Sequence, residues 1–276
     1  MRDISIALGA TLAGRYRVER ELGHGGMATV FLAERANGGG PVAIKVLHPQ
    51  FAAALGPERF HREIETLTRL RHPQIVPVLD SDEAGTLLYL VMPYVPGENL
   101  RSRLEREGQL PIQAVLSIAQ DIAAAVDFAH RQNVLHRDIK PENVLLEGDR
   151  ALVCDFGLAR AIDRAALESL SSSGLVIGTP AYMSPEQAMA EENLGPACDI
   201  YALGCVVYEM LTGELPFSGP TPQAMIARHL SERPRPVRTV RPEVTLGMEA
   251  AVLTALAKEP EGRPRSAAEL LQQLSA

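Results

Sequence analysis

The chain has 276 residues, enough for one large domain or two small ones. Its hydrophobic content of 46% is ample for a packed core, and its charged share of 22% is ordinary for a globular protein. The formal net charge of -7 argues against nucleic acid as a partner, because binding to phosphate backbones needs a basic surface.

The cysteines and the N-terminus bear on the compartment. Cys154, Cys198 and Cys205 are odd in number and have apolar neighbours, which favours buried, reduced thiols and a cytosolic protein. The first ten residues, MRDISIALGA, lack the sustained apolar region of a signal peptide. No run approaches the roughly 18 to 20 apolar residues of a membrane span. We therefore predict a cytoplasmic location and no membrane segment within this chain.

The first part of the chain reads as a small sheet with one helix. Residues 15–22, 29–35 and 41–47 are predicted strands, and the glycine-rich stretch 23–28 joins the first two. Glycines let a hairpin tip bring backbone N–H groups close to phosphate oxygens. Residues 57–70 have apolar side chains at a helical period. Two more predicted strands, 75–79 and 87–93, complete five strands, and 93–97 is a predicted hinge.

Beyond residue 97 the pattern is mainly helical. Pro111 begins a helix that is apolar on most faces, and 197–211 form another, so both are predicted to be buried. Asp199 lies inside the second helix, where a carboxylate needs hydrogen-bond partners. Residues 222–276 are predicted to form three further helices, the last of them capped by Ser266.

The stretch 136–157, HRDIKPENVLLEGDRALVCDFG, carries the strongest chemical signal. Asp138, Lys140 and Asn143 lie within six positions, and Asp155 follows seventeen residues after Asp138. Two short apolar runs around the turn 147–150 predict a hairpin between these polar clusters. A hairpin with an acid at each end can aim both carboxylates at one site. Oxygen ligands for a hard metal, a cation for phosphate and a carboxylate for a hydroxyl proton suit a magnesium-nucleotide site.

The pattern HRDxKxxN followed by DFG resembles the catalytic core of eukaryotic-type protein kinases. The VAIK strand at 42–45 and GTPAYMSPE at 178–186 resemble the same family, in the same order. The resemblance covers about residues 15 to 274 and is greatest to bacterial eukaryotic-like serine/threonine kinases. It implies an α+β, bilobal fold: a five-stranded antiparallel small lobe with one helix, residues 1–95, and a mainly helical large lobe, residues 96–276, with ATP in the cleft.

The resemblance implies a nucleotide site built largely from the small lobe. Lys45 would hold the α- and β-phosphates, and Glu63 would pair with it, chosen over Glu58 and Glu65 because the FxRE register matches the family. Ala28 stands where the family pattern GxGxxGxV has its third glycine. The residues expected to contact the nucleotide, including the gatekeeper Met92 and the hinge, are Leu22, Gly23, Gly25, Val30, Ala43, Lys45, Glu63, Met92, Pro93, Val95 and Leu145.

The resemblance also implies the roles of the catalytic residues. Asn143 and Asp155 would hold Mg²⁺, with Mn²⁺ as a substitute. Asp138 would orient the attacking hydroxyl and accept its proton late, while Lys140 neutralises charge on the γ-phosphate. Lys140 and Thr179 together mark serine/threonine rather than tyrosine specificity.

Other residues are scaffold in this resemblance. The backbone N–H groups of the His136–Arg137 region would bond Asp199, and Glu186 would pair with Arg263. His136 and Phe156 are assigned to packing.

The resemblance places an activation segment at 158–186. Its serines, Ser169, Ser171, Ser172 and Ser173, form one cluster, in which Ser171 and Ser173 are the expected phosphorylation sites. Autophosphorylation between molecules would require a transient homodimer, and Arg137 would receive the phosphate. Protein substrates and ATP are the expected partners. Because bacterial relatives often continue into a membrane helix, the chain is also interpretable as the cytoplasmic domain of a longer, membrane-anchored protein.

Two alternatives stay open. A pseudokinase or signalling scaffold binds nucleotide or partners without catalysis, but it usually lacks the lysine, the catalytic aspartate or the metal aspartate, and all three are present. A small-molecule phosphotransferase of related fold typically lacks a long activation segment ending in [S/A]-P-E, which this chain has.

Overall fold

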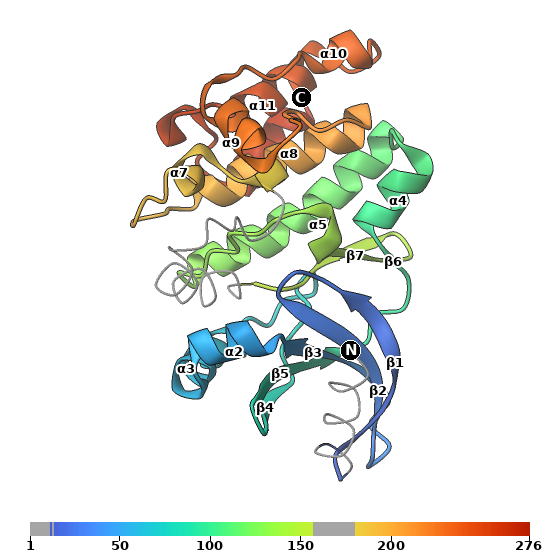
Figure 1. Ribbon diagram of the computed structural model, residues 1–276. Helices are drawn as coiled ribbons and strands as arrows, with labels where there is room; N and C mark the ends of the chain where they lie inside the picture. The colour runs from blue at the N-terminus through green and yellow to red at the C-terminus, as the bar shows by residue number, and fades with distance from the viewer. Residues whose placement is uncertain (1–11, 13, 157–179) are drawn as a thin grey trace. The chain divides into compact units, whose positions relative to one another are not determined.

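The computed structural model describes residues 12, 14–156 and 180–276 (Figure 1). It has two compact units, each considered by itself. Among the described residues, the first, here called the sheet unit, takes 12, 14–71 and 76–95. The second, here called the helical unit, takes 72–75, 96–156 and 180–276. The Thr179 and serine-cluster predictions lie outside the described residues.

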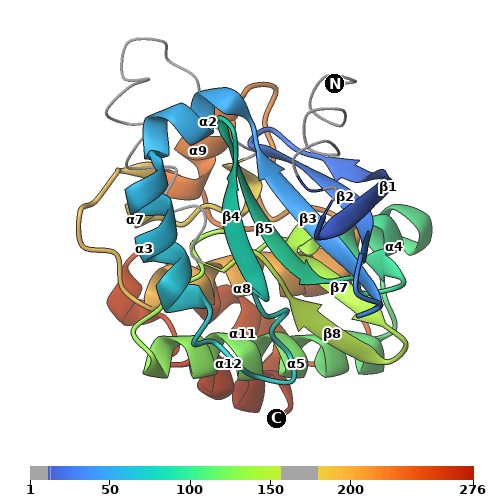
Figure 2. The same cartoon turned by 90° about the horizontal axis from the view of Figure 1, so that it is seen from below.

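The sheet unit is built on one five-stranded antiparallel sheet with the order β1-β2-β3-β5-β4 (Figure 2). On β3, Val42, Ile44 and Val46 are buried, whereas Ala43 and Lys45 between them are only half-buried. This alternation follows from the two-residue period of a strand. The strands are β1 (Tyr16–His24), β2 (Ala28–Arg35), β3 (Pro41–Leu47), β4 (Asp80–Ala84) and β5 (Leu87–Pro93).

One face of this sheet carries a continuous apolar core. Its buried side chains come from β1, β2, β3 and β5 and from Leu12, which precedes the sheet. Two helices, α2 (Pro49–Leu55) and α3 (Pro57–Leu67), belong to the same unit, where α2 packs against β5 and α3 against β4 (Figure 2). Only α3 is predicted by the sequence pattern, and it ends three residues earlier than the predicted 57–70.

The predicted strand at 75–79 is wrong. The fourth strand of the sheet is β4, at residues 80–84. Pro77 interrupts the predicted run, because proline has no N–H to donate to a ladder. Ile75 makes only an isolated parallel bridge to Val153 within the helical unit, and Leu79 donates its N–H to the carbonyl of Val91 just before β4 begins.

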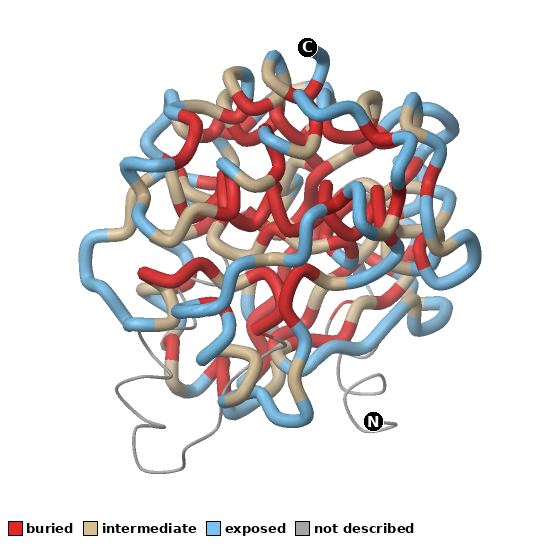
Figure 3. The backbone as a smooth tube through the Cα atoms, turned by 90° about the horizontal axis from the view of Figure 1, so that it is seen from above, coloured by how far each residue is buried: buried red, intermediate tan, exposed pale blue. Residues whose placement is uncertain are grey.

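The helical unit is organised around α5 (Ile112–Arg131) and α8 (Ala197–Thr212), which pack against each other. Every residue of α8 from Cys198 to Thr212 is buried. Figure 3 draws the buried residues of the chain in red. All three cysteines are buried, as predicted. The other helices and 3₁₀ turns are α4 (Leu100–Glu107), η1 (Pro141–Asn143), η2 (Pro180–Tyr182), α7 (Pro185–Ala188), α9 (Pro222–Ser231), α10 (Val237–Val240), α11 (Leu246–Ala255), η3 (Pro260–Gly262) and α12 (Ala267–Leu274).

The C-terminal region has one helix more than predicted. Residues 222–276, all described, form α9 to α12 rather than three helices. The additional helix, α10, is a single turn flanked by Pro236 and Arg241, too short to show an apolar period. The predicted cap is confirmed, because the Ser266 hydroxyl accepts a hydrogen bond from the Glu269 N–H at 3.1 Å.

Helix α5 is, within the described part of the chain, the one helix whose length and composition would allow it to cross a membrane. Core helices of compact proteins can have the same length and apolar composition. Here α5 packs against α8, α12 and β8 in the helical unit. Its composition therefore does not establish a membrane span.

A three-stranded sheet, β6-β7-β8, lies beside these helices. The predicted hairpin is confirmed as β7 (Val144–Glu147) and β8 (Arg150–Val153), and β6 (Glu98–Asn99) pairs with β7. Gly97, with φ at 133°, allows β6 to approach so closely, because a β-carbon there would collide with the carbonyl oxygen of Leu146. The molecule thus has the α+β composition expected from the sequence.

Candidate active site

The first residues of the loop 136–143, here called the catalytic loop, are hydrogen-bonded to a buried carboxylate. Asp199 of α8 accepts hydrogen bonds from the backbone N–H groups of His136 at 2.8 Å and Arg137 at 2.7 Å, as predicted. It is also bonded to Nε2 of His130, at 2.7 Å. Sequence reasoning missed His130, whose only signal was its place in the last turn of α5.

Asp199 keeps its charge despite complete burial. Burial alone would raise its pKa, but the hydrogen bond and charge of His130, aided by the backbone N–H of Arg137, lower the pKa below its ordinary value. An ionised carboxylate with these donors is a firm anchor, since hydrogen bonds to charged groups are about twice as strong as neutral ones.

Arg137 adopts an unusual backbone conformation between two anchors. Its φ is +68°, in the left-handed region, which costs an L-residue roughly 1–2 kcal/mol. Asp199 holds its N–H, and the Gln187 side chain of α7 donates to its carbonyl at 2.8 Å. These bonds impose the turn that leads the chain from His136 into Asp138.

Asp138, Lys140 and Asn143 are brought together at the end of this loop. The Lys140 ammonium lies 2.7 Å from Oδ2 of Asp138. Nδ2 of Asn143 donates to the same oxygen at 3.1 Å and to the Asp138 carbonyl at 2.7 Å. The Asp138 side chain is still 40% exposed, so its carboxylate is both positioned and accessible.

Asn143 and Asp155 have the chemistry of a divalent-cation site. Because the amide nitrogen of Asn143 faces the two Asp138 oxygens, its Oδ1 remains as a hard oxygen donor. The Cys154 N–H donates to the Asn143 carbonyl at 3.0 Å, which ties the neighbour of Asp155 to Asn143. Among the described residues, no group of three or more histidine, cysteine or acidic side chains could hold a metal ion. Two protein ligands completed by phosphate and water oxygens suit Mg²⁺.

His136 and Phe156 pack against each other, as predicted. Their ring centroids are 4.5 Å apart, and both side chains are buried. His136 Nε2 is also within 2.9 Å of the Cys154 carbonyl. This packing joins the start of the catalytic loop to the segment that carries Asp155.

In the sheet unit, several predicted nucleotide residues share one face. Val30 pairs with Lys45, and Ala43 with Met92, across neighbouring strands. Directly paired residues of a sheet project to the same side. Lys45 therefore lies on the face opposite the apolar core, together with these three apolar residues.

The glycine-rich stretch forms the turn between β1 and β2. Gly23 pairs with Val30, and the Gly25 N–H donates to the carbonyl of Ala28 at 2.9 Å. Ala28 is 4% exposed and is the first residue of β2. The residue that departs from the family pattern is therefore part of the sheet.

The remaining nucleotide assignments stay predictions. Leu22 is on β1, and Glu63 lies half-buried on α3 beside the buried Ile64. Pro93 ends β5, and Val95 follows it in the sheet unit. Leu145 is on β7 of the helical unit, paired with Leu152.

The predicted pair Glu186–Arg263 is confirmed as a buried, two-pronged ion pair. The guanidinium nitrogens lie 2.7 and 2.8 Å from the carboxylate oxygens, and the arginine and glutamate side chains are 0% and 5% exposed. Arg263 also donates to the carbonyl of Ala197 at 2.9 Å. This pair fixes the segment after η2 to the start of α8.

The family model described as protein kinase domain matches residues 16–274. The chain belongs to the protein kinase family. A serine/threonine-protein kinase of Myxococcus xanthus, pkn2, is 40% identical over 96% of this chain, and PknB of Mycobacterium leprae is 41% identical over 95%. The crystal structure of the Mycobacterium tuberculosis PknI kinase domain matches with a TM-score of 0.75 and 30% identity, covering 95% of both chains.

This kinase domain spans only 32% and 43% of the lengths of pkn2 and PknB. The family match and the identities to pkn2 and PknB confirm the predicted resemblance to bacterial serine/threonine kinases. The match to the PknI kinase domain confirms the bilobal α+β fold class of that family. The family uses ATP and a divalent metal.

Proposed function

We propose that this protein transfers the γ-phosphoryl group of ATP to serine and threonine hydroxyls of protein substrates. The arrangement of Asp138, Lys140 and Asn143, bonded to one another in a loop that starts on Asp199, carries the proposal. Phosphoryl transfer depends mainly on positioning and on neutralising charge. A loop held by a buried, ionised carboxylate supplies the positioning.

The proposal assigns a role to each catalytic side chain. Asp138 orients the substrate hydroxyl and accepts its proton late in the transfer. Lys140, in contact with Asp138, neutralises charge on the γ-phosphate. Thr179 acts together with Lys140 in selecting serine and threonine hydroxyls. Asn143 holds Asp138 through its amide nitrogen and leaves its oxygen for the metal.

Asn143 and Asp155 would hold Mg²⁺, or Mn²⁺ in its place. These two residues would supply oxygen ligands to the ion, whose positive charge would offset negative charge on the phosphates. In this protein, the backbone bond between Cys154 and Asn143 keeps the two ligands on neighbouring segments. Asp138 would accept the proton of the substrate hydroxyl and would not act as a metal ligand.

Nucleotide binding is assigned mainly to the sheet unit. Lys45, with Glu63 as its partner, would hold the α- and β-phosphates, and Val30, Ala43 and Met92 on the same sheet face would contact the adenosine. Residues 1–95 and 96–276 would then act as the small and large lobes. The hinge atoms that bond adenine would be the Pro93 carbonyl and the Val95 N–H.

The decisive experiment incubates the protein with ATP, Mg²⁺ and a serine/threonine peptide library, with a panel of small-molecule alcohols and amines in parallel. We expect phosphopeptides, and we expect Asp138→Asn to reduce transfer by about 10² to 10⁴ without loss of ATP binding. The matched control is Asp149→Asn at the exposed β7–β8 turn. Phosphorylation of small molecules alone, or ATP binding without any transfer by the wild type, would contradict the proposal and favour one of the two alternatives.

Activation by autophosphorylation of Ser171 and Ser173 is part of the proposal. Arg137 supports it, since its Nε is buried and has no hydrogen-bond partner among the described residues. A phosphoserine brings nearly two negative charges and strong acceptor oxygens to such a guanidinium. Phosphopeptide mapping of the wild type against Asp138→Asn tests it, and an active wild type with no phosphate between residues 169 and 173 would refute it.

A transient homodimer would carry out this reaction between molecules, in the cytoplasm. The length of the relatives supports a parent protein larger than this domain, and a membrane anchor outside residues 1–276 is part of the same proposal.

A further inference from the structure

A second buried carboxylate on α8 sits ten residues after Asp199. Glu209 is 5% exposed, and Arg101 of α4 binds both of its oxygens, at 2.7 and 3.2 Å. Burial disfavours the charged guanidinium, but the Glu209 carboxylate outweighs burial and raises the pKa of Arg101. The two-pronged geometry matches the planar fork of arginine and not the point charge of lysine.

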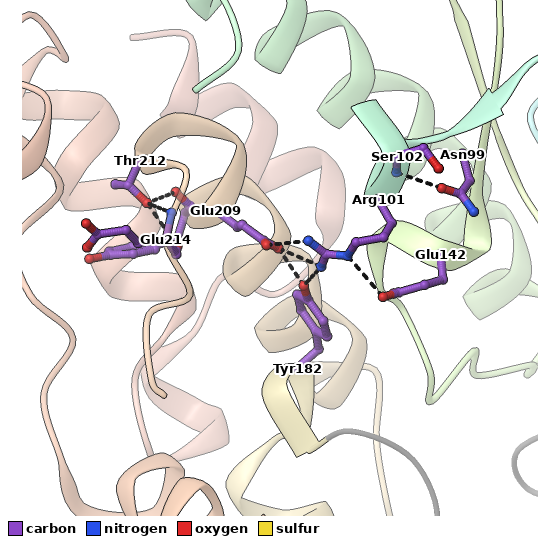
Figure 4. Close-up of polar contacts among 9 residues, drawn as sticks. Asn99, Arg101, Ser102, Glu142, Tyr182, Glu209, Thr212 and Glu214 are labelled. Atoms are coloured by element: carbon purple, nitrogen blue, oxygen red, sulfur yellow. Dashed lines mark hydrogen bonds and ion pairs between the residues drawn. The ribbon is translucent and has the colours of Figure 1, made fainter. Parts of the chain in front are cut away.

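Arg101 also forms hydrogen bonds to two residues other than Glu209. Its Nε donates to Glu142 of η1 at 3.1 Å, and its Nη2 donates to the hydroxyl of Tyr182 in η2 (Figure 4). The Tyr182 hydroxyl donates in turn to Glu209. Burial, together with Glu209, raises the pKa of Tyr182, so this hydroxyl keeps the proton that it donates.

The partners of Arg101 flank the two segments that must meet a substrate. Glu142 immediately precedes Asn143, which bonds Asp138. Tyr182 follows Thr179 by three positions. One guanidinium therefore links the end of the catalytic loop to the segment that leads away from Thr179.

Helix α8 thus holds the catalytic loop at both ends. Asp199 bonds its first residues directly, and Glu209 reaches its last residues through Arg101 and Glu142. Ten residues of helix separate the two carboxylates by roughly 15 Å along the axis. A rigid helix with a buried anchor near each end sets the span of the loop.

Arg101 is itself held in place. Asn99 pairs with Leu145 in the β6–β7 ladder, and its side chain caps α4 by accepting from the Ser102 N–H at 2.9 Å (Figure 4). The backbone of Arg101, the second residue of α4, is therefore fixed independently of the contacts of its side chain.

We propose that Arg101 is a positioning residue of the kinase reaction, which sets the end of the catalytic loop and the Tyr182 segment in register for the protein substrate. The inference rests on the proposed function. It adds Arg101, Glu142 and Tyr182 to the residues on which transfer depends. None of them is needed to bind ATP.

The test uses variants that each remove or weaken one arm of the network. Glu142→Gln weakens the arm to the catalytic loop, and Tyr182→Phe removes the arm to η2, while both leave the buried Arg101–Glu209 pair intact. Arg101→Lys keeps the charge but breaks the fork. Arg106→Lys on the same helix is the matched control, because Arg106 pairs with the nearby Glu98 and Glu107 on the surface.

We expect Tyr182→Phe to raise KM for a peptide substrate about tenfold and Glu142→Gln to lower kcat about fivefold, while KM for ATP stays within twofold. Arg101→Lys should lower kcat/KM for peptide about 10²-fold, and adding Glu142→Gln to it should have little further effect, because the arm is already lost. The control should match the wild type in every parameter.

Two outcomes would overturn the inference. One is kinetics within twofold of wild type for all three variants. The other is a fall in melting temperature accompanied by equal losses in peptide and ATP parameters, which indicates a purely structural role. A wild-type protein that transfers no phosphate to any peptide would instead refute the proposed function, so the two failures are distinguishable.

Discussion

The catalytic loop and the glycine-rich turn are held in opposite ways. Distant, buried carboxylates of α8 hold the catalytic loop, and the nearer of them lies 62 residues beyond Arg137 in the chain. The glycine-rich turn is held by its own strands and by His48, the residue after β3. The His48 ring lies 3.2 Å from the Gly26 carbonyl and 3.2 Å from the Thr29 hydroxyl, and its backbone N–H donates to the Met27 carbonyl at 2.9 Å.

The difference follows from what each segment must do. In the proposed function, Asp138 aligns a hydroxyl, and such a carboxylate loses its effect when it is misplaced by about 1 Å, which fits a loop bonded to buried charge. The glycine-rich turn is proposed to accept and release a nucleotide, which needs weaker restraints, and neutral hydrogen bonds contribute only about 0.5–1.5 kcal/mol each. We therefore expect substitutions at the anchors of the two segments to differ in size and in the parameter they change.

The largest effect is expected at Asp199. In Asp199→Asn, an amide N–H would face backbone N–H donors, so one anchor of the loop becomes repulsive. We expect transfer to fall at least tenfold and the free energy of unfolding to fall by about 3–5 kcal/mol, as when one partner of a buried charged network is removed. Urea unfolding and peptide kinetics measure both, with the exposed Glu192→Gln as control. Unchanged stability would show that the loop does not depend on this anchor.

A smaller, pH-dependent effect is expected from His229, also in the helical unit. Burial and the charge of Lys258 lower its pKa to about 4, against about 6.5 in the unfolded chain. The unfolded state therefore takes up the proton first as the pH falls, and stability is lost between about pH 6.5 and 4. The loss at pH 5 should be about 2 kcal/mol.

Melting temperatures at pH 7 and pH 5 test this. In His229→Gln the part of the acid destabilisation due to His229 should disappear, whereas His61→Gln, at an exposed site on α3 in the sheet unit, should leave it unchanged. Identical pH dependence in the wild type and His229→Gln would contradict the assignment of this loss to His229.

The smallest effect is expected at the glycine-rich turn. His48→Ala removes two side-chain hydrogen bonds near solvent, so KM for ATP should rise about fivefold, equivalent to roughly 1 kcal/mol. The peptide KM and the melting temperature should stay near wild type, and Gln50→Ala at the exposed start of α2 is the control. A large loss of stability in His48→Ala would mean that this turn is anchored as firmly as the catalytic loop.

Much of the fold was predictable from local pattern. Strands β3 and β5 have the predicted limits, because alternation and continuous burial leave a clear period in the sequence. The two-residue strand β6 and the single-turn α10 were missed, since elements this short carry no period. The fourth strand was displaced by the interrupting Pro77.

In the candidate site, too, local contacts were predictable from the sequence and long-range contacts were not. The spacing of Asp138, Lys140 and Asn143 was sufficient to predict their association, because they lie on one short loop. The Asp199 and Glu186 contacts were anticipated only through family resemblance. Arg101 was missed altogether. Its partners lie 41, 81 and 108 residues away in sequence, and no local pattern connects them.

The left-handed backbone of Arg137 and Asp155 has a consequence for directed evolution. Their φ angles are +68° and +66°, values at which glycine avoids the steric cost of a side chain. A library of this domain selected for heat resistance alone would favour glycine at both positions, because glycine adopts a positive φ without steric cost. The same replacements would delete the guanidinium next to the proposed catalytic aspartate and the proposed metal carboxylate. Selection for stability would therefore favour glycine at these two positions, whereas selection for phosphoryl transfer would favour arginine and aspartate.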